Sequence, residues 1–356
     1  MKRIDFALLT LVVLLTFFGL FMIYDASSYV AFRDFGDKYH FLKSQIFWIA
    51  IGFFLMGFFS IFPYQKLYNL ALPFMIGAFV LLVMVFVPGV GVTLLGARRW
   101  IDARFFLVQP AEFVKLALTV YLAAWFSNKE KGRLLSFLLL MGLVLGLIFL
   151  EPDMGTAIVV LGEALSLYFL SGGNALYMSI LAPLLALIGF ILVKISPYRA
   201  QRLTAFLNID SSLSNTSYHI KQILIALGSG GLTGVGIGNS LQKYAYLPET
   251  TTDSIFAIIA EELGFVGAVC LIIVFMAIAI RGFAIAAAAK DPFGKLLAGG
   301  IMSFLTIQMV INLGAMTALF PLTGIPLPFI SYGGSALIVD LASVGILLNI
   351  SKQRKI

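Results

Sequence analysis

Long apolar runs separated by short polar segments fill most of this sequence. A helix needs about 20 consecutive apolar residues to cross the hydrocarbon core of a bilayer. Runs of about this length predict ten spanning helices, near residues 6–24, 45–62, 69–88, 110–126, 134–150, 154–171, 175–194, 254–280, 296–320 and 332–350. Barrel strands are short and alternate apolar with polar positions, so the pattern argues against a β-barrel. It predicts an all-α polytopic membrane protein that forms a single integral membrane domain over residues 1–356.

The composition agrees with this pattern. Hydrophobic residues make up 61% of the 356 residues, and charged residues only 12%. Soluble domains carry roughly a quarter charged residues, so a water-soluble fold could not hide this much apolar surface. The first run follows Lys2 and Arg3 as a signal peptide would, but it is long enough to span and lacks a good cleavage site after it. We therefore expect it to be the first membrane helix.

Two long polar segments are predicted on one side of the membrane, near residues 89–109 and 195–253. The second would be a large extracytoplasmic loop between the seventh and eighth helices, and a loop of this length is uncommon without structure or function of its own. Ten crossings place both termini on one side, and the Lys and Arg residues of the short loops there predict that both are cytoplasmic. The opposite side is also basic, which an anionic substrate on that face would explain.

A carboxylate stands where the second polar segment meets the eighth apolar run. Asp253 directly precedes the helix predicted from residue 254. Asp is a preferred N-cap, so this residue could simply satisfy free amides of that helix. An acid at a membrane edge is also a candidate functional residue, because it can keep its solvation and still touch a lipid-borne substrate. Helical geometry favours Glu261 over Glu262 as an assistant of Asp253, since Glu262 falls on the opposite face.

Arginines and glycines are concentrated in the two outer segments. Guanidinium groups match phosphate oxygens in pairs and could clamp a pyrophosphate, or they could anchor the chain at lipid headgroups with Trp100 in the aromatic belt. The arginines concerned are Arg98, Arg99, Arg199 and Arg202. The glycine-rich run 228–238 could cradle an anion through its backbone amides. It lacks a Walker motif, however, and is also typical of a flexible turn.

Charged residues inside the predicted helices need partners. Glu112 and Lys115 lie three residues apart, hence on one helix face, and predict an internally neutralised pair. Glu163 and Asp340 lie deeper and would suggest a proton relay in a transporter, or acids hydrogen-bonded inside the bundle. The Pro- and Gly-broken stretch 324–335 predicts a wall of a lipid-substrate groove, because irregular backbone at membrane depth survives only beside a cavity or inside protein.

Soft metal ligands are scarce. Cys270 is the single cysteine, which excludes a disulfide framework and a thiolate metal cluster within this chain. His40 and His219 are the only histidines, which argues against a His-based metal site or catalytic triad.

Seven stretches carry a family resemblance: GARRWI (96–101), QPAEFVKLAL (109–118), PDMGTA (152–157), PYRAQRLTAFL (197–207), GSGGLTGVGIGNSLQK (228–243), YLPETTTDSIFAIIAEELG (246–264) and GIPLPFISYGGSALIV (324–339). In this order they resemble the SEDS family (shape, elongation, division and sporulation), membrane glycosyltransferases that polymerise peptidoglycan. VPGVGV (87–92) and the spacing of Gln-Lys before Tyr-Leu-Pro-Glu are more similar to the division branch, FtsW, than to the elongation branch, RodA. Departures at Arg104, Ala111, Ser254 and Asp340 bear on the shape of the cavity and remove no residue thought to be catalytic.

The resemblance implies lipid II as substrate, a disaccharide-pentapeptide on undecaprenyl pyrophosphate. Asp253 matches the essential acid of the family, either as general base on the 4-hydroxyl of the acceptor sugar or as a ligand that holds it near a divalent cation, Mg or Mn. No organic cofactor and no nucleic acid is implied. The candidate substrate-binding residues are Arg98, Arg99, Trp100, Arg199, Arg202, Lys221, Lys243, Glu249 and Ser331, and the candidates that shape the cavity are Glu112, Lys115, Glu261 and Pro328.

The resemblance also implies a cellular location and protein partners. The expected location is the bacterial cytoplasmic (inner) membrane, and the expected partners are a class B penicillin-binding protein, which is a transpeptidase, and other membrane proteins of the divisome or elongasome. Two other functions are weighed beside polymerisation. A lipid II flippase would depend on Glu163 or Asp340, whereas a non-catalytic scaffold for the transpeptidase would tolerate replacement of Asp253.

Overall fold

The computed structural model describes residues 4–94, 97–104, 106–128, 134–173, 197–207, 215–244 and 246–353. Nine of the ten predicted spans appear there as helices, and the seventh, 175–194, lies outside the described residues. The nine are α1 (Phe6–Phe35), α2 (His40–Ile61), α3 (Gln65–Met84), α4 (Pro110–Ser127), α5 (Leu134–Leu150), α6 (Met154–Leu170), α10 (Ile255–Ala287), α11 (Pro292–Met316) and α12 (Gly334–Ser351).

Apolar length supports a membrane location for most of these helices. Six of them, α1, α2, α3, α10, α11 and α12, are long and apolar enough to cross a bilayer. The shorter α5 and α6 are also apolar, with 17 residues each. Together with the family described below, these helices make the chain a multi-pass membrane protein.

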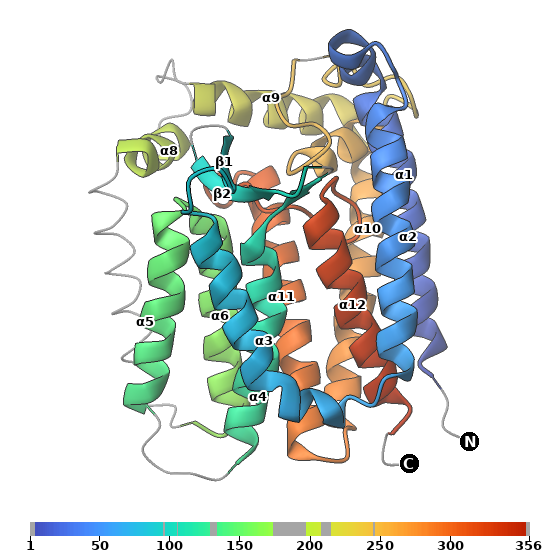
Figure 1. Cartoon of the computed structure of the whole chain (residues 1–356). Helices are drawn as coiled ribbons and strands as arrows, with labels where there is room; N and C mark the ends of the chain where they lie inside the picture. The colour runs from blue at the N-terminus through green and yellow to red at the C-terminus, as the bar shows by residue number, and fades with distance from the viewer. Residues whose placement is uncertain are drawn as a thin grey trace.

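The spanning helices stand side by side, with their axes roughly aligned (Figure 1). α12 packs along α2, α3 along α4, and α10 along α11, while α11 also contacts α4 and α6. α12 is nearly all buried, and so is most of α11, which places these two helices in the interior. The start of α1 and the end of α12 meet at one end of the bundle, where the Asp5 amide donates to the Ser351 hydroxyl at 3.1 Å.

The two outer segments are more ordered than polar loops. Residues near 89–109 form a small antiparallel sheet of β1 (Gly91–Leu94), β2 (Ala97–Asp102) and β3 (Leu107–Val108), in that order. The described part of 195–253 contains α8 (Pro197–Leu207) and α9 (Asn215–Gly230). The sheet and both helices lie at the end of the bundle opposite the two chain termini (Figure 1).

α10 is broken in its outer third by Gly264. This residue has φ 67° and ψ −168°, which is not helical. A Cβ at this position would lie 2.2 Å from the Gly234 amide nitrogen, so only glycine lets the two backbones approach this closely. The break allows the Gly236 and Val235 amides to donate to the Glu262 and Glu261 carbonyls, which docks the glycine-rich run against α10.

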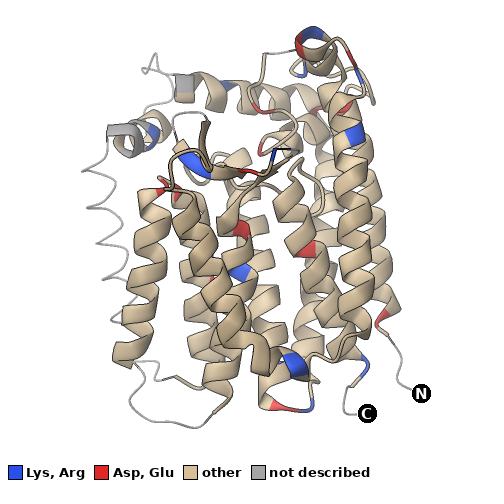
Figure 2. Cartoon of the chain, viewed as in Figure 1, with Lys and Arg blue, Asp and Glu red and all other residues tan. Residues whose placement is uncertain are grey.

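Most charged residues lie toward the two ends of the bundle, and few lie between them (Figure 2). The predicted internal pair is among those few: Lys115 lies 2.7 Å from Glu112, and both side chains are at most 3% exposed. Lys115 also donates to the Gln308 amide oxygen on α11 at 2.6 Å. Of the two deeper acids, Glu163 accepts a hydrogen bond from Thr119, and Asp340 is 1% exposed on α12. The pair and Gln308 therefore tie α4 to α11 inside the bundle.

Replacing Lys115 by Met should destabilise the fold strongly. The substitution keeps the length of the side chain but leaves the Glu112 carboxylate buried without its counter-charge, which typically costs about 3–5 kcal/mol. Thermal unfolding of the purified protein in detergent measures this loss. The double variant Glu112→Gln/Lys115→Met removes both charges and should recover most of the stability. A Lys115→Met protein that unfolds at the wild-type temperature would contradict this role.

Candidate active site

A cavity of about 820 Å³ opens at the end of the bundle that carries the sheet, α8 and α9. Its wall is built by β2, the N-caps of α4 and α6, α8 and α9, the segment before α10, and the irregular stretch before α12. The lining residues that carry charge or an imidazole are Arg99, Asp153, Arg202, His219, Glu249 and Asp253. The stretch 324–335, predicted as a wall, contributes Gly324, Pro326, Tyr332, Gly333 and Ser335.

Asp253 is held in this wall by its neighbours. Its side chain accepts a hydrogen bond from the Thr252 hydroxyl at 2.7 Å through Oδ1. Its backbone carbonyl accepts from the amide of Asn312, a buried residue of α11, at 3.0 Å. The residue is 8% exposed and lines the cavity. Asp253 therefore presents a fixed carboxylate to whatever occupies the cavity.

The N-cap interpretation of Asp253 is wrong. α10 begins at Ile255, its N-cap is Ser254, and neither residue caps the helix through its side chain. Residues 251–253 form turns that precede the first turn of the helix. Capping of α10 therefore does not account for Asp253.

Ser331 and Tyr332 clamp the segment that carries Asp253. The Ser331 hydroxyl donates to the Thr252 carbonyl at 2.5 Å and accepts from the Leu327 amide at 2.8 Å. The Tyr332 amide donates to the Thr251 carbonyl at 2.8 Å. Ser331 is 5% exposed and both of its hydrogen bonds are to backbone, so the structure uses this candidate substrate ligand to fix the active-site segment.

Glu249 is a second carboxylate in the same wall. It adopts a left-handed backbone conformation with φ 52°, and its carbonyl accepts from the Thr252 and Ser254 amides, both at 3.2 Å. Asp253, together with partial burial, raises the pKa of Glu249 to about 8. The Glu249 side chain is exposed, so water screens part of this repulsion. The two acids therefore act on one another, and Glu249 holds its proton to a higher pH than an isolated glutamate.

Two arginines and a tryptophan line the same cavity as the acids. Arg99 donates to the Glu151 carbonyl at 3.1 Å and to the Pro152 carbonyl at 2.5 Å, and Arg202 donates to the Leu322 carbonyl at 3.0 Å. Backbone carbonyls orient these guanidinium groups. With Trp100 on β2 they give the cavity a positive, partly aromatic wall.

Other candidate ligands are engaged elsewhere. Arg98 donates to the carbonyls of Phe86, Val87 and Gly91, which fastens the sheet to the end of α3. Lys221 does not line the cavity. The side chain of Arg199 lies outside the described part of the chain.

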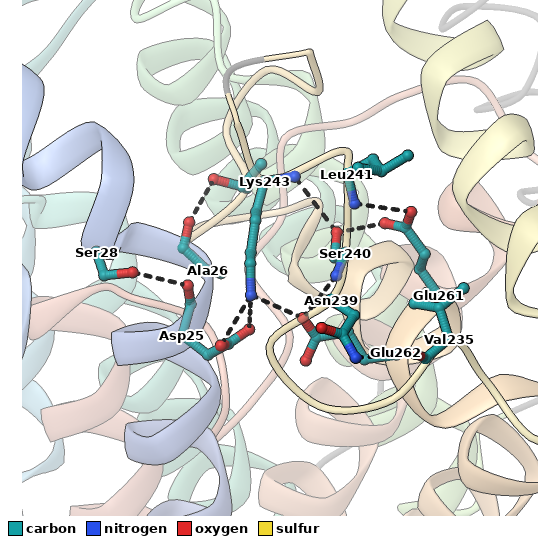
Figure 3. A network of polar contacts seen from close by, with 11 residues as sticks. Asp25, Ala26, Ser28, Val235, Asn239, Ser240, Leu241, Lys243, Glu261 and Glu262 are labelled. Atoms are coloured by element: carbon teal, nitrogen blue, oxygen red, sulfur yellow. Dashed lines mark hydrogen bonds and ion pairs between the residues drawn. The ribbon is translucent and has the colours of Figure 1, made fainter.

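Lys243 is the centre of a separate buried network (Figure 3). Its amino group lies 2.9 Å from Asp25 on α1 and 3.0 Å from Glu262 on α10, and the lysine is 4% exposed. Two carboxylates neutralise it, and it is absent from the cavity wall. Lys243 therefore joins α1, α10 and the glycine-rich run.

Glu261 belongs to the same network rather than to the acid pair at the cavity. It accepts from the Ser240 hydroxyl and, at 3.2 Å, from the Leu241 amide. The expectation that it assists Asp253 is therefore wrong, since these contacts direct it to the glycine-rich run. Pro328 lies in a small apolar pocket lined by residues of α10 and α11, away from the cavity.

Sequence reasoning missed Asp153, His219 and Asn312 as residues of the site. His219 lines the cavity from α9, and its Nε2 lies 2.8 Å from the Ser254 hydroxyl. Asn312 bridges the carbonyls of Asp253 and Ile325 at 3.0 and 2.7 Å. The available signal for Asn312 was a polar side chain on an otherwise apolar helix, which points to an internal hydrogen-bond partner. His219 lies in the polar first half of α9 and had no such signal.

Comparison with known proteins identifies relatives over the full length. The family of FtsW, RodA and SpoVE, described as "Cell cycle protein", matches residues 6–356. Stage V sporulation protein E of Bacillus subtilis is 40% identical over 358 residues, covering 99% of this chain and 98% of that protein. The probable peptidoglycan glycosyltransferase FtsW of Geobacter metallireducens is 38% identical over 360 residues, covering 99% and 96%.

Solved structures share the fold. A chain of a peptidoglycan synthase complex that coordinates polymerization and crosslinking superposes with a TM-score of 0.82 at 28% identity, covering 99% of this chain and 98% of that one. RodA of Thermus thermophilus superposes with a TM-score of 0.74 at 29% identity, with the same coverage. The resemblance drawn from the sequence motifs is thus confirmed.

Replacing Glu249 by Gln should change how stability depends on pH. The folded protein holds the Glu249 proton more tightly than the unfolded chain, whose pKa lies near 4.5. Between about pH 4.5 and 8 the native state therefore binds more protons, and the unfolding free energy of the wild type falls as the pH rises. The thermal unfolding temperature of Glu249→Gln relative to wild type should increase from about pH 5 to about pH 9. A difference that is constant across this range would contradict the coupling.

Proposed function

Because this chain belongs to the FtsW/RodA/SpoVE family and is a multi-pass peptidoglycan glycosyltransferase, we propose that it polymerises lipid II into glycan strands and releases undecaprenyl pyrophosphate. One observation carries the assignment to the site: the Asp253 carboxylate is fixed in the wall of a cavity that also presents Arg99 and Arg202. An acid that can take a proton and cations that can stabilise an anionic leaving group are the two requirements of this reaction.

Asp253 acts as general base in this proposal. Its carboxylate accepts the proton of the 4-hydroxyl on the acceptor sugar, and the hydroxyl oxygen attacks the anomeric carbon of the donor. A new glycosidic bond forms while the bond between that carbon and the pyrophosphate oxygen breaks. The electron pair leaves with undecaprenyl pyrophosphate. The clamp by Ser331 and Asn312 supports this role, because a base must be held within hydrogen-bonding reach of its proton.

Arg99 and Arg202 are proposed to hold the pyrophosphate. Guanidinium groups bind phosphate oxygens in pairs, and their charge stabilises the negative charge that develops on the leaving group. Both are oriented by backbone carbonyls, so little movement is needed when the substrate enters. Trp100 offers an aromatic surface on the same wall, which suits the apolar face of a sugar ring.

The divalent cation expected from the resemblance stays a prediction. Among the described residues, no three His, Cys, Asp or Glu side chains gather as a metal centre. The mechanism above therefore assigns no metal ligand and passes no step through a cation.

We further propose that the cavity faces the outside of the bacterial cytoplasmic membrane, with both termini in the cytoplasm. The cavity and the chain termini lie at opposite ends of the bundle, so this orientation brings lipid II headgroups to Asp253. A class B penicillin-binding protein is the proposed partner. The complex that this chain resembles joins polymerization to crosslinking, and division, with a relative named FtsW, is the proposed setting.

Purified protein and lipid II, with and without a class B penicillin-binding protein, test this function. Wild type should form glycan chains, and Asp253→Ala should lower the rate roughly 10²- to 10⁴-fold, as expected for loss of a general base. Asp34→Asn is a matched control, because Asp34 forms only an exposed ion pair with Arg33 on α1 and should leave the rate unchanged.

Two results would overturn the proposal. An Asp253→Ala protein that polymerises at the wild-type rate would remove Asp253 from the mechanism and favour a scaffold whose activity comes from the partner. No glycan from wild type, even with the partner and a divalent cation, would favour lipid II transport, to be measured by flipping assays on Glu163 and Asp340 variants.

A further inference from the structure

His219 is the only imidazole among the residues that line the cavity. It lies on α9, whereas Asp253 and Ser254 lie at the start of α10, and these two helices pack against each other. The Nε2 atom of His219 and the Ser254 hydroxyl are 2.8 Å apart, a hydrogen bond between the two elements. The ring therefore connects the outer helix to the residue directly after the proposed base.

Ser254 is used in an unusual way. A serine in the N-cap position normally gives its side-chain oxygen to an amide of the first helical turn. α10 has Ser254 as N-cap but no such bond, and the hydroxyl bonds to His219 instead. Ser254 is fully buried, so its hydroxyl needs this partner in place of water. α10 therefore lacks a side-chain capping bond, and the Ser254–His219 hydrogen bond attaches the active-site segment to α9 instead.

The surroundings keep the ring uncharged at neutral pH. Burial lowers the pKa of His219 below its usual value of 6.5, Arg202 lowers it further, and Asp253 opposes both. The other charged residues that line the cavity are Arg99, Asp153 and Glu249, and the phenol of Tyr218 is next to the ring in sequence. An uncharged ring forms no ion pair with Asp253, so the carboxylate remains free to accept a proton from the substrate.

We propose that His219 is a positioning residue for Asp253, which through Ser254 fixes the carboxylate toward the acceptor hydroxyl and which serves the reaction only while its ring is uncharged. This inference rests on the proposed function, in which Asp253 is the base. Protonation would place an imidazolium beside Asp253, where it would attract the carboxylate and compete with the acceptor hydroxyl. The rate of polymerisation should then fall as the pH drops through the lowered pKa of His219.

Two substitutions separate the hydrogen bond from the charge. His219→Gln keeps a group that can bond to Ser254 but cannot be protonated, whereas His219→Leu fills the space with neither property. At about pH 7.5, His219→Leu should lose roughly 3- to 10-fold in kcat, as for loss of one hydrogen bond, while His219→Gln stays close to wild type. Because the pKa of His219 lies below 6.5, the wild-type rate should decline only at a pH below that value, and His219→Gln should there retain a larger fraction of its rate than wild type.

A double-mutant cycle with Ser254→Ala tests whether His219 acts through Ser254. If it does, His219→Leu/Ser254→Ala should be no slower than the slower single variant, because both remove the same bond. His40→Gln is the matched control: His40 stacks on Phe35 outside the cavity, and its replacement should leave the pH profile unchanged.

The outcomes distinguish this inference from the proposed function. A His219→Leu rate equal to wild type, or additive effects in the cycle, would overturn the positioning role. A His219→Gln profile identical to wild type would overturn the requirement for an uncharged ring. In each case Asp253→Ala in the same assay reports separately on the base: if it remains inactive the proposed function stands without His219, and if it is active the proposed function itself fails.

Discussion

The active site depends on one constraint of membrane proteins, that irregular backbone must find its hydrogen-bond partners inside the protein. Residues 248–253 and 322–333 both have irregular backbone, and each segment supplies hydrogen-bond partners for the backbone groups of the other. Ser331 donates to the Thr252 carbonyl, the Tyr332 amide to the Thr251 carbonyl, and Asn312 bridges the carbonyls of Asp253 and Ile325. The shape of the cavity and the place of Asp253 follow from this mutual pairing, because neither segment has a helix or strand to hold it.

A buried ion pair connects the wall of the cavity to the helical bundle. Lys115, which is paired with Glu112, donates to the side-chain oxygen of Gln308. The side-chain amide of Gln308 in turn donates to the Pro326 carbonyl at 3.1 Å. Gln308 lies on α11, one helical turn before Asn312. An ion pair at membrane depth costs desolvation energy, so its value here lies in fixing positions rather than in net stability. The candidate role of Glu112 and Lys115 in shaping the cavity thus has a direct structural route, through Gln308 to the wall at Pro326.

Sequence reasoning predicted the bundle well because hydrophobic length follows from the thickness of the bilayer. It predicted the pairing of Glu112 with Lys115 because residues three apart share a helix face. It failed where helical geometry was applied to irregular backbone. Extending the α10 helix back to Asp253 placed Glu261 near that acid, but residues 251–253 form turns, so the regular geometry on which this rested is absent. The sheet at 91–108 was missed because its strands are only two to six residues long.

The same reasoning explains which basic residues were misjudged. Arg98 and Arg99 are adjacent in sequence, so composition cannot separate them, yet neighbouring residues of a strand point to opposite faces. On β2, Arg98 donates to the carbonyls at the end of α3, whereas Arg99 lines the cavity. Lys243 was equally ambiguous, because its two acidic partners lie 218 and 19 residues away. The basic residues of these two segments thus divide, in the fold, into Arg99 and Arg202, which line the cavity, and Arg98 and Lys243, which join elements of the chain to one another.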